Sequence, residues 1–167
     1  MPHWHSLRIF RLDMGSKGQS RMLWDSGSDA FWGFLSPDMQ RLLYVSYKSG
    51  VGQVCIRGWP DMSSREIQIS IQGGTDPLWS MDGKEAFYRN GDQYLRVAVP
   101  VSLDSWVPKP EAMFKSNYLN VIAKPWDVMP DGQHFVMIQP THPDPPGTEL
   151  YLVQNWFEEL KRLVPVK

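Results

Sequence analysis

The segment LSPDMQRLLYVS at positions 35–46 joins a turn motif to a short apolar run. Pro37 suits the second position of a type I turn and Asp38 suits the third, whereas Met39 stands where glycine is usual. The apolar residues at 42–44 are consecutive, so they place apolar side chains on both faces of a strand. The segment therefore predicts a β-hairpin whose second strand is buried between two layers.

The same pattern occurs twice more along the chain, in WSMDGKEAFYRN (79–90) and VMPDGQHFVMIQ (128–139). Asp82 lies 44 residues after Asp38, and Asp131 lies 49 residues after Asp82. These spacings are close to the roughly 40–45 residues of a four-stranded propeller blade. The residues predicted to form the structural turns are Pro37, Asp38, Met39, Asp82, Gly83, Pro130, Asp131 and Gly132.

Further strands are predicted after each hairpin and before the first one. The third strands are QVCIRGW (53–59), QYLRVAVP (93–100) and ELYLVQNW (149–156), and the fourth are REIQISI (65–71) and AMFKSNY (112–118). LRIFRLD (7–13) and SRMLWDS (20–26) have the pattern of the last two strands of an earlier blade. The chain is thus predicted to be all-β, a partial β-propeller of about three and a half four-stranded blades.

The predicted propeller segment covers residues 1–167 as one unit. It divides into a half blade (1–29), two blades (30–73 and 74–122), a last blade (123–154) and a short C-terminal α-helix (155–165). Asn155 and Glu158 have the spacing of a capping box at the start of that helix. Trp156, Leu160 and Leu163 fall on one helical face, which predicts that they dock the helix on the propeller body.

Composition excludes several classes of function. The formal net charge of −1 gives no basis for binding nucleic acid, and no apolar run is long enough for a membrane segment. The chain has 42% hydrophobic and 21% charged residues, as globular proteins do. The single cysteine, Cys55, excludes an internal disulfide. No compartment is predicted from the residues themselves.

Several residues allow a chemical interpretation beside a structural one. Asp38, Asp82 and Asp131 could bind Ca²⁺, but one blade separates each from the next, and turn stabilisation is the favoured role. The histidines at 3, 5, 134 and 142 are scattered, and Cys55 lies within an apolar strand. Gly73-Gly74 precedes no helix, so a phosphate loop is disfavoured. The prediction is no catalytic, no cofactor-binding and no metal residues, and no cofactor.

Two longer segments carry a resemblance to a known family. GFLSPDMQRLLYVSYKSGVGQVCIRGWP (33–60) and GGTDPLWSMDGKEAFYRNGDQYLRVAV (73–99) resemble the final blades of TolB-like, WD-repeat-like bacterial β-propellers, and the ending at 155–165 is similar to their terminus. Met39 and Met81 depart from the Gly and Pro of the family motif. Members of this type are found attached to Ser/Thr protein kinases.

The resemblance implies a non-catalytic interaction or sensor module, kinase-associated and C-terminal in a larger bacterial regulatory protein. Its partner would be a protein or the remaining propeller blades, and an extracytoplasmic location is compatible with the family. Open blade faces would favour self-association. Two alternatives stay open: the propeller portion of a dipeptidyl-peptidase-type serine hydrolase, and a gene remnant without independent function.

Overall fold

The computed structural model of the protein describes residues 9–12, 20–24, 28–116 and 124–139, and this part of the chain is all-β. Its strands are β1 (Ile9–Leu12), β2 (Ser20–Trp24), β3 (Ala30–Leu35), β4 (Arg41–Ser46), β5 (Gln53–Gly58), β6 (Ile67–Gln68), β7 (Thr75–Trp79), β8 (Glu85–Asn90), β9 (Gln93–Ala98), β10 (Glu111–Lys115), β11 (Trp126–Val128) and β12 (Phe135–Met137). A helix long and apolar enough to cross a membrane does not occur among the described residues.

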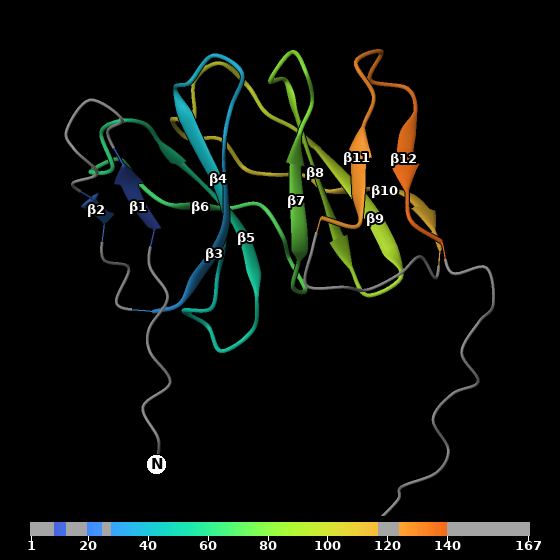
Figure 1. The fold of residues 1–167 in the computed structure, drawn as a ribbon, viewed down its shortest axis with the longest axis horizontal. Coiled ribbons are helices and arrows are strands. Elements are labelled where there is room, and N and C mark those ends of the chain that lie inside the picture. The colour runs from blue at the N-terminus through green and yellow to red at the C-terminus, as the bar shows by residue number, and fades with distance from the viewer. Residues whose placement is uncertain (1–8, 13–19, 25–27, 117–123, 140–167) are drawn as a thin grey trace, which may run out of the picture.

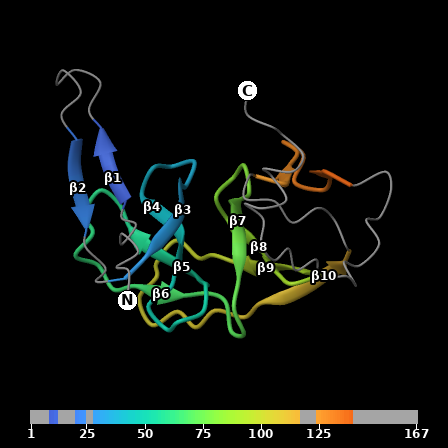
Figure 2. The ribbon, with the colours of Figure 1, turned by 60° about the horizontal axis from the view of Figure 1, so that its bottom comes forward.

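The strands form four antiparallel sheets that follow one another in chain order (Figures 1 and 2). Two sheets have four strands, in the orders β3-β4-β5-β6 and β7-β8-β9-β10, so each strand pairs with the next along the chain. The hairpins β1–β2 and β11–β12 lie at the two ends of this series. Contacts join β1 to β3, β3 and β4 to β7, and β7 to β11.

Both faces of each four-stranded sheet are covered, and strand β4 shows why. Leu43 and Val45 point to one face and belong to a core shared with the second four-stranded sheet. Leu42 and Tyr44 point to the other face, where they pack with partly buried Ile9. A run of apolar residues without alternation is what a strand covered on both faces requires.

Three buried clusters connect the four sheets. The central cluster lies between the four-stranded sheets and includes Val54, Ile56, Trp79, Tyr88 and Val97. The second, around Ala30 and Cys55, lies on the outer face of the first sheet. The third joins the second sheet to β11–β12 and includes Leu78, Phe87, Tyr94, Trp126 and Val128. Apolar burial thus runs continuously from one end of the series to the other.

The three hairpin turns share one hydrogen-bond pattern. The Oδ1 atom of Asp38 accepts the Gln40 N–H at 3.0 Å, that of Asp82 accepts the Lys84 N–H at 3.0 Å, and that of Asp131 accepts the Gln133 N–H at 2.9 Å. The pKa of each of the three carboxyl groups lies below its ordinary value, because hydrogen bonds favour the ionised form. At Asp38 the Ser36 hydroxyl contributes most, followed by the Gln40 N–H, and at Asp82 the Lys84 N–H contributes most. At Asp131 the His134 side chain contributes most, and together with the main-chain N–H groups of Gln133 and His134 it lowers the pKa to about 2.

Met39 has the backbone conformation that glycine adopts in the other two turns. Its φ is 55°, compared with 71° at Gly83 and 66° at Gly132. A residue with a Cβ atom is strained there, so we expect Met39→Gly to raise the free energy of unfolding by about 1 kcal/mol. Chemical denaturation of the two chains measures this difference. An unchanged or lower stability would show that the exposed Met39 side chain compensates for its backbone strain.

The structure contains the three predicted hairpins as β3–β4, β7–β8 and β11–β12. The predicted fourth strand at 65–71 is shorter than expected, since the regular strand comprises Ile67 and Gln68, after which the Ile69 N–H still donates to the Val54 carbonyl oxygen at 2.8 Å. The predicted strand at 149–156 and the helix at 155–165 lie outside the described residues, as do Trp156, Leu160 and Leu163. The all-β class is therefore confirmed at the level of small antiparallel sheets.

Candidate functional site

The first strands of the two four-stranded sheets are irregular at the same position. Trp32 in β3 and Asp76 in β7 both lie six residues before their turn aspartates, and both have positive φ, 50° and 51°. The strand pairing shifts register across these residues, between Phe31 and Phe34 and between Thr75 and Leu78. Positive φ at non-glycine residues is uncommon, and such strain is concentrated at functional sites.

Asp76 forms a buried ion pair with Arg89 of the adjacent strand β8. The Arg89 Nε atom lies 3.3 Å from the Asp76 Oδ2 atom, and the two side chains are only 5% and 6% exposed. Burial raises the pKa of Asp76 above its ordinary value, and the positive charge of Arg89 opposes part of this rise. A buried ion pair of this kind adds little net stability to the fold, which makes the two residues candidates for a functional role.

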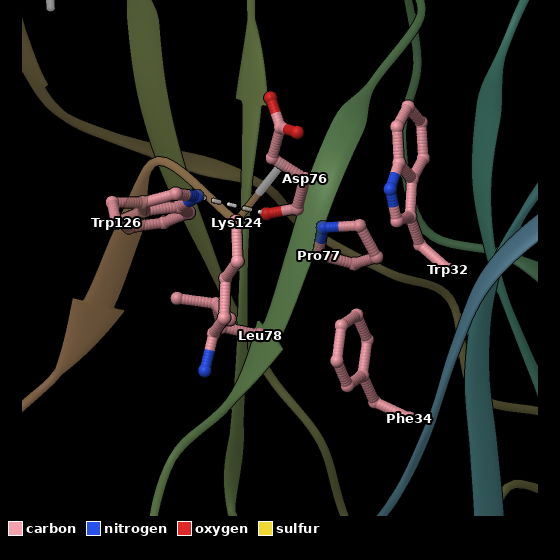
Figure 3. A pocket seen from close by; sticks show the side chains of 7 residues that line it. All are labelled: Trp32, Phe34, Asp76, Pro77, Leu78, Lys124 and Trp126. Atoms are coloured by element: carbon pink, nitrogen blue, oxygen red, sulfur yellow. Dashed lines mark hydrogen bonds between the residues drawn. The ribbon is translucent and has the colours of Figure 1, made fainter. Parts of the chain in front are cut away.

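An aromatic crevice lies on one side of Asp76 (Figure 3). The Trp126 indole N–H donates to the Asp76 carbonyl oxygen at 3.0 Å, and Pro77 and Trp32 line the opposite wall. The Asp76 carboxylate points away from the Lys124 amine, which pairs with Asp127 at 2.7 Å. The cavity has a volume of about 10 Å³, roughly the space of one water molecule. It has no room for an organic ligand.

A larger hollow lies where three turns meet, next to Arg89. Its volume is about 350 Å³, within the roughly 300–1,000 Å³ of small-molecule sites. The wall comes from the β4–β5 turn, the β6–β7 link and the β8–β9 turn, and its lining includes Gly50, Gly52, Gly73, Gly74 and Gly91 together with Thr75 and Arg89. Much of the wall is therefore main chain, which can offer peptide hydrogen-bonding groups to a polar ligand.

Gly74 shows that this part of the wall is closely packed against the core. A Cβ atom at Gly74 would lie 2.8 Å from a Tyr88 ring carbon and 2.9 Å from a Val54 methyl group. Glycine is thus required for the β6–β7 link to approach the two sheets. The link leads directly into Thr75 and Asp76, so its position also fixes the buried ion pair.

Thr75 connects the hollow to the ion pair. Its side chain lines the hollow, and its hydroxyl donates to the Asp76 Oδ2 atom at 3.1 Å. The same oxygen lies 3.3 Å from Arg89. A chain of polar contacts therefore runs from the hollow through the hydroxyl to a carboxylate and a guanidinium, which are groups able to move a proton and to stabilise negative charge.

The residues singled out in the sequence lie elsewhere. Asp38, Asp82 and Asp131 are in the hairpin turns, and no group of three His, Cys, Asp or Glu side chains suited to a metal ion occurs in the described parts of the chain. His134 is exposed and its Nδ1 atom lies 2.6 Å from Asp131. Cys55 is buried as expected, and burial raises its pKa to about 12, which keeps the thiol protonated.

Sequence reasoning missed both Asp76 and Arg89 as functional candidates. A signal was available, because Arg89 belongs to a strand whose neighbours Ala86, Phe87 and Tyr88 are apolar on both faces. A charge in such a strand needs a buried partner. Asp76 also occupies the position of Trp32 in the repeat, where an acidic residue has no role in forming the hairpin.

Comparison with known proteins gives a match in structure alone. No protein-family model matches the chain, and no curated protein matches it in sequence. The fold is similar to the crystal structure of a putative 6-phosphogluconolactonase from Bacteroides uniformis ATCC 8492, with a TM-score of 0.54 and 17% identity. The match covers 78% of this chain and 40% of that protein, so the chain spans less than half of its length.

The resemblance to TolB-like, WD-repeat-like propellers is wrong by this comparison. It was based on the Ser-Pro-Asp turn and its spacing, yet no family model matches and the similar structure is named as a lactonase. The physical reason lies in the turn itself. An aspartate that accepts main-chain N–H groups before a residue with positive φ stabilises a hairpin in any antiparallel sheet. The motif therefore reports a turn geometry rather than a family.

The predicted role of a non-catalytic, kinase-associated interaction or sensor module is also wrong. The similar structure is named as an enzyme, and this finding contradicts the basis on which the chain was predicted not to be one. The same comparison gives no support to the two alternatives, a portion of a dipeptidyl-peptidase-type hydrolase and a gene remnant. Motifs along the sequence do not reveal the Asp76–Arg89 pair, because the two side chains meet only across paired strands.

Proposed function

We propose that this chain is part of a hydrolase that opens a lactone of a phosphorylated sugar acid, and that the substrate binds in the glycine-lined hollow. The observation that carries the proposal is the buried Asp76–Arg89 pair beside a hollow of about 350 Å³. The name of the similar protein supplies the substrate class. The hollow lies in the part of the chain where two consecutive sheets meet.

The proposal also covers how the four sheets are arranged. We infer that the four sheets are successive blades of a propeller-like arrangement, with the two complete blades within 30–73 and 74–122. Support comes from the identical strand order of the four-stranded sheets and from the burial of both faces of each. Adjacent blades of a propeller need both properties, because each blade is covered by its two neighbours.

The chemistry of a lactone fits the groups beside the hollow. A lactone is a cyclic ester, so its hydrolysis needs a base that takes a proton from the attacking water and a donor that stabilises the negative oxygen that forms. Asp76 has the raised pKa of a group adapted to proton transfer. Thr75 carries a hydrogen bond from the hollow to that carboxylate, and Arg89 supplies positive charge next to it.

The test is hydrolysis of 6-phosphogluconolactone by the purified chain, followed by titration of the acid that is released. We expect Asp76→Asn to lower kcat/KM by about 100-fold or more, the usual contribution of a general base. Thr75→Val keeps the ion pair but removes the hydroxyl that connects the hollow to the Asp76 carboxylate, so it is expected to lower kcat/KM by about 100-fold as well. Thermal melts of both variants separate loss of activity from loss of folding.

Asp61→Asn is the matched control, since Asp61 is an exposed carboxylate in the β5–β6 link and accepts a hydrogen bond from the Ser63 N–H. It should hydrolyse the lactone at the rate of the unmodified chain. A folded chain that shows no hydrolysis above the uncatalysed rate would contradict the proposal. So would a folded Thr75→Val variant whose rate equals that of the unmodified chain.

A further inference from the structure

We propose that a second groove, at the opposite end of the β7–β10 sheet, binds a neutral saccharide. The groove has a volume of about 330 Å³, and it is lined by Glu85, Arg96, Ala98, Trp106, Val107, Lys109 and Glu111. In the pairing of β8 with β9, Glu85 lies opposite Ala98 at this end, whereas Asn90 lies opposite Gln93 at the end near the hollow. The groove is therefore separate from the proposed hydrolytic site.

The charged side chains of the groove neutralise one another. Arg96 donates to the Glu111 Oε2 atom from both Nε, at 3.1 Å, and Nη2, at 3.0 Å, and its Nη1 atom lies 3.7 Å from Glu85 Oε1. With Lys109, the lining holds two cationic and two anionic side chains. A groove without net charge attracts neither an anion nor a metal ion strongly. We therefore expect its ligand to be uncharged.

The side chains are arranged for an array of hydroxyl groups. A guanidinium has five N–H donors, and Glu111 takes two of them in the bonds described. Carboxylates are acceptors with about four lone-pair sites each, so Glu85 and Glu111 add acceptor capacity beside those donors. Planar groups of both kinds can bind adjacent hydroxyls, each of which donates one hydrogen bond and accepts others.

Trp106 adds an aromatic surface beside these charged groups. It lies in the link at 99–110 and packs against the central core, which fixes its position. The preceding residue, Ser105, has positive φ (56°), and the Trp106 N–H donates to the Leu103 carbonyl oxygen at 3.3 Å. An indole presents a wide apolar face with negative potential, which suits the C–H face of a sugar ring. An aromatic face next to hydroxyl-binding groups indicates a saccharide.

The ion pairs of the groove are not explained by stability. The Arg96 and Glu111 side chains are 49% and 65% exposed, and exposed pairs contribute little to folding. A volume of about 330 Å³ is at the lower end of small-molecule sites, which favours a mono- or disaccharide. The groove is thus a preformed site with a fixed aromatic wall and an oriented guanidinium.

The experiment is isothermal titration of the purified chain with maltose, cellobiose and glucose 6-phosphate. We expect at least one of the two neutral disaccharides to bind, and glucose 6-phosphate to bind more weakly than both. Arg96→Gln is expected to weaken disaccharide binding by about tenfold or more. Trp106→Leu should do the same, and Arg96→Gln serves where the tryptophan variant does not fold. Arg65→Gln, at an exposed arginine in the β5–β6 link, should bind as the unmodified chain does.

Three results would overturn the assignment. The first is no heat of binding for either disaccharide up to about 10 mM, where even weak sites are occupied. The second is disaccharide binding that Arg96→Gln leaves unchanged. The third is loss of binding in Thr75→Val, which would place the sugar in the hollow. Lactone hydrolysis is measured in a separate assay, so a negative result for saccharide binding does not affect the proposed hydrolysis, and the reverse also holds.

Discussion

Arg89→Met is expected to lower the free energy of unfolding by about 3–5 kcal/mol at neutral pH, the usual cost of removing one partner from a buried ion pair. The Asp76 carboxylate would stay 6% exposed and lose the guanidinium 3.3 Å away. Methionine fills much of the volume of the arginine stem, so the loss arises mainly from the uncompensated charge. Urea denaturation of the two chains gives the difference directly.

The pH dependence of this loss identifies its electrostatic origin. Burial already raises the pKa of Asp76, and removing Arg89 removes a charge that lowers it. A carboxyl group whose pKa is higher in the folded than in the unfolded state favours folding at low pH, and this advantage is lost as the pH rises through the folded pKa. The deficit of Arg89→Met should therefore be smaller near pH 4 than near pH 7.

Two further variants complete the measurement. The double variant Asp76→Asn, Arg89→Met removes both charges and should regain most of the lost stability at pH 7. Arg65→Met changes an exposed arginine and should stay within about 0.5 kcal/mol of the unmodified chain. A deficit below about 1 kcal/mol, or one that does not change with pH, would show that the pair is solvated in solution.

The strands were predictable because their signals are local. The turn aspartates at 38, 82 and 131 each accept a hydrogen bond from a main-chain N–H two residues away, so both partners lie within one short stretch of sequence. Consecutive apolar residues such as Leu42 and Leu43 likewise indicate a strand covered on both faces. Met39 was identifiable as unusual from comparison with Gly83 and Gly132, and its φ of 55° lies in the same region as theirs.

The candidate sites were not predictable in this way, because they depend on contacts between distant residues. Asp76 and Arg89 are thirteen positions apart on paired strands, and the hollow needs three turns from two sheets. The groove depends on how the link at 99–110 folds back to place Trp106 near Arg96. None of these side chains belongs to a motif with fixed spacing, so local patterns favoured structural roles for them.

The packing of β11 against the second four-stranded sheet depends on Trp126. This side chain is 2% exposed, and its indole N–H donates to the Asp76 carbonyl oxygen at 3.0 Å. Its ring centroid lies 4.9 Å from that of Tyr94 and 5.6 Å from that of Phe135. Trp126→Ala is expected to lower the free energy of unfolding by about 3–5 kcal/mol, because it leaves a large cavity in the third apolar cluster.

Trp126→Phe separates the hydrogen bond from the packing. A phenylalanine ring keeps part of the aromatic contact with Tyr94 but leaves the buried Asp76 carbonyl without its indole donor, a loss of about 1–3 kcal/mol. Trp79→Phe is the matched variant, since the Trp79 indole donates to the Phe34 carbonyl oxygen at 3.1 Å. If Trp126→Ala cost no more than Trp126→Phe, β11 and β12 would not be packed on the second sheet, and the inferred succession of blades would end at β10.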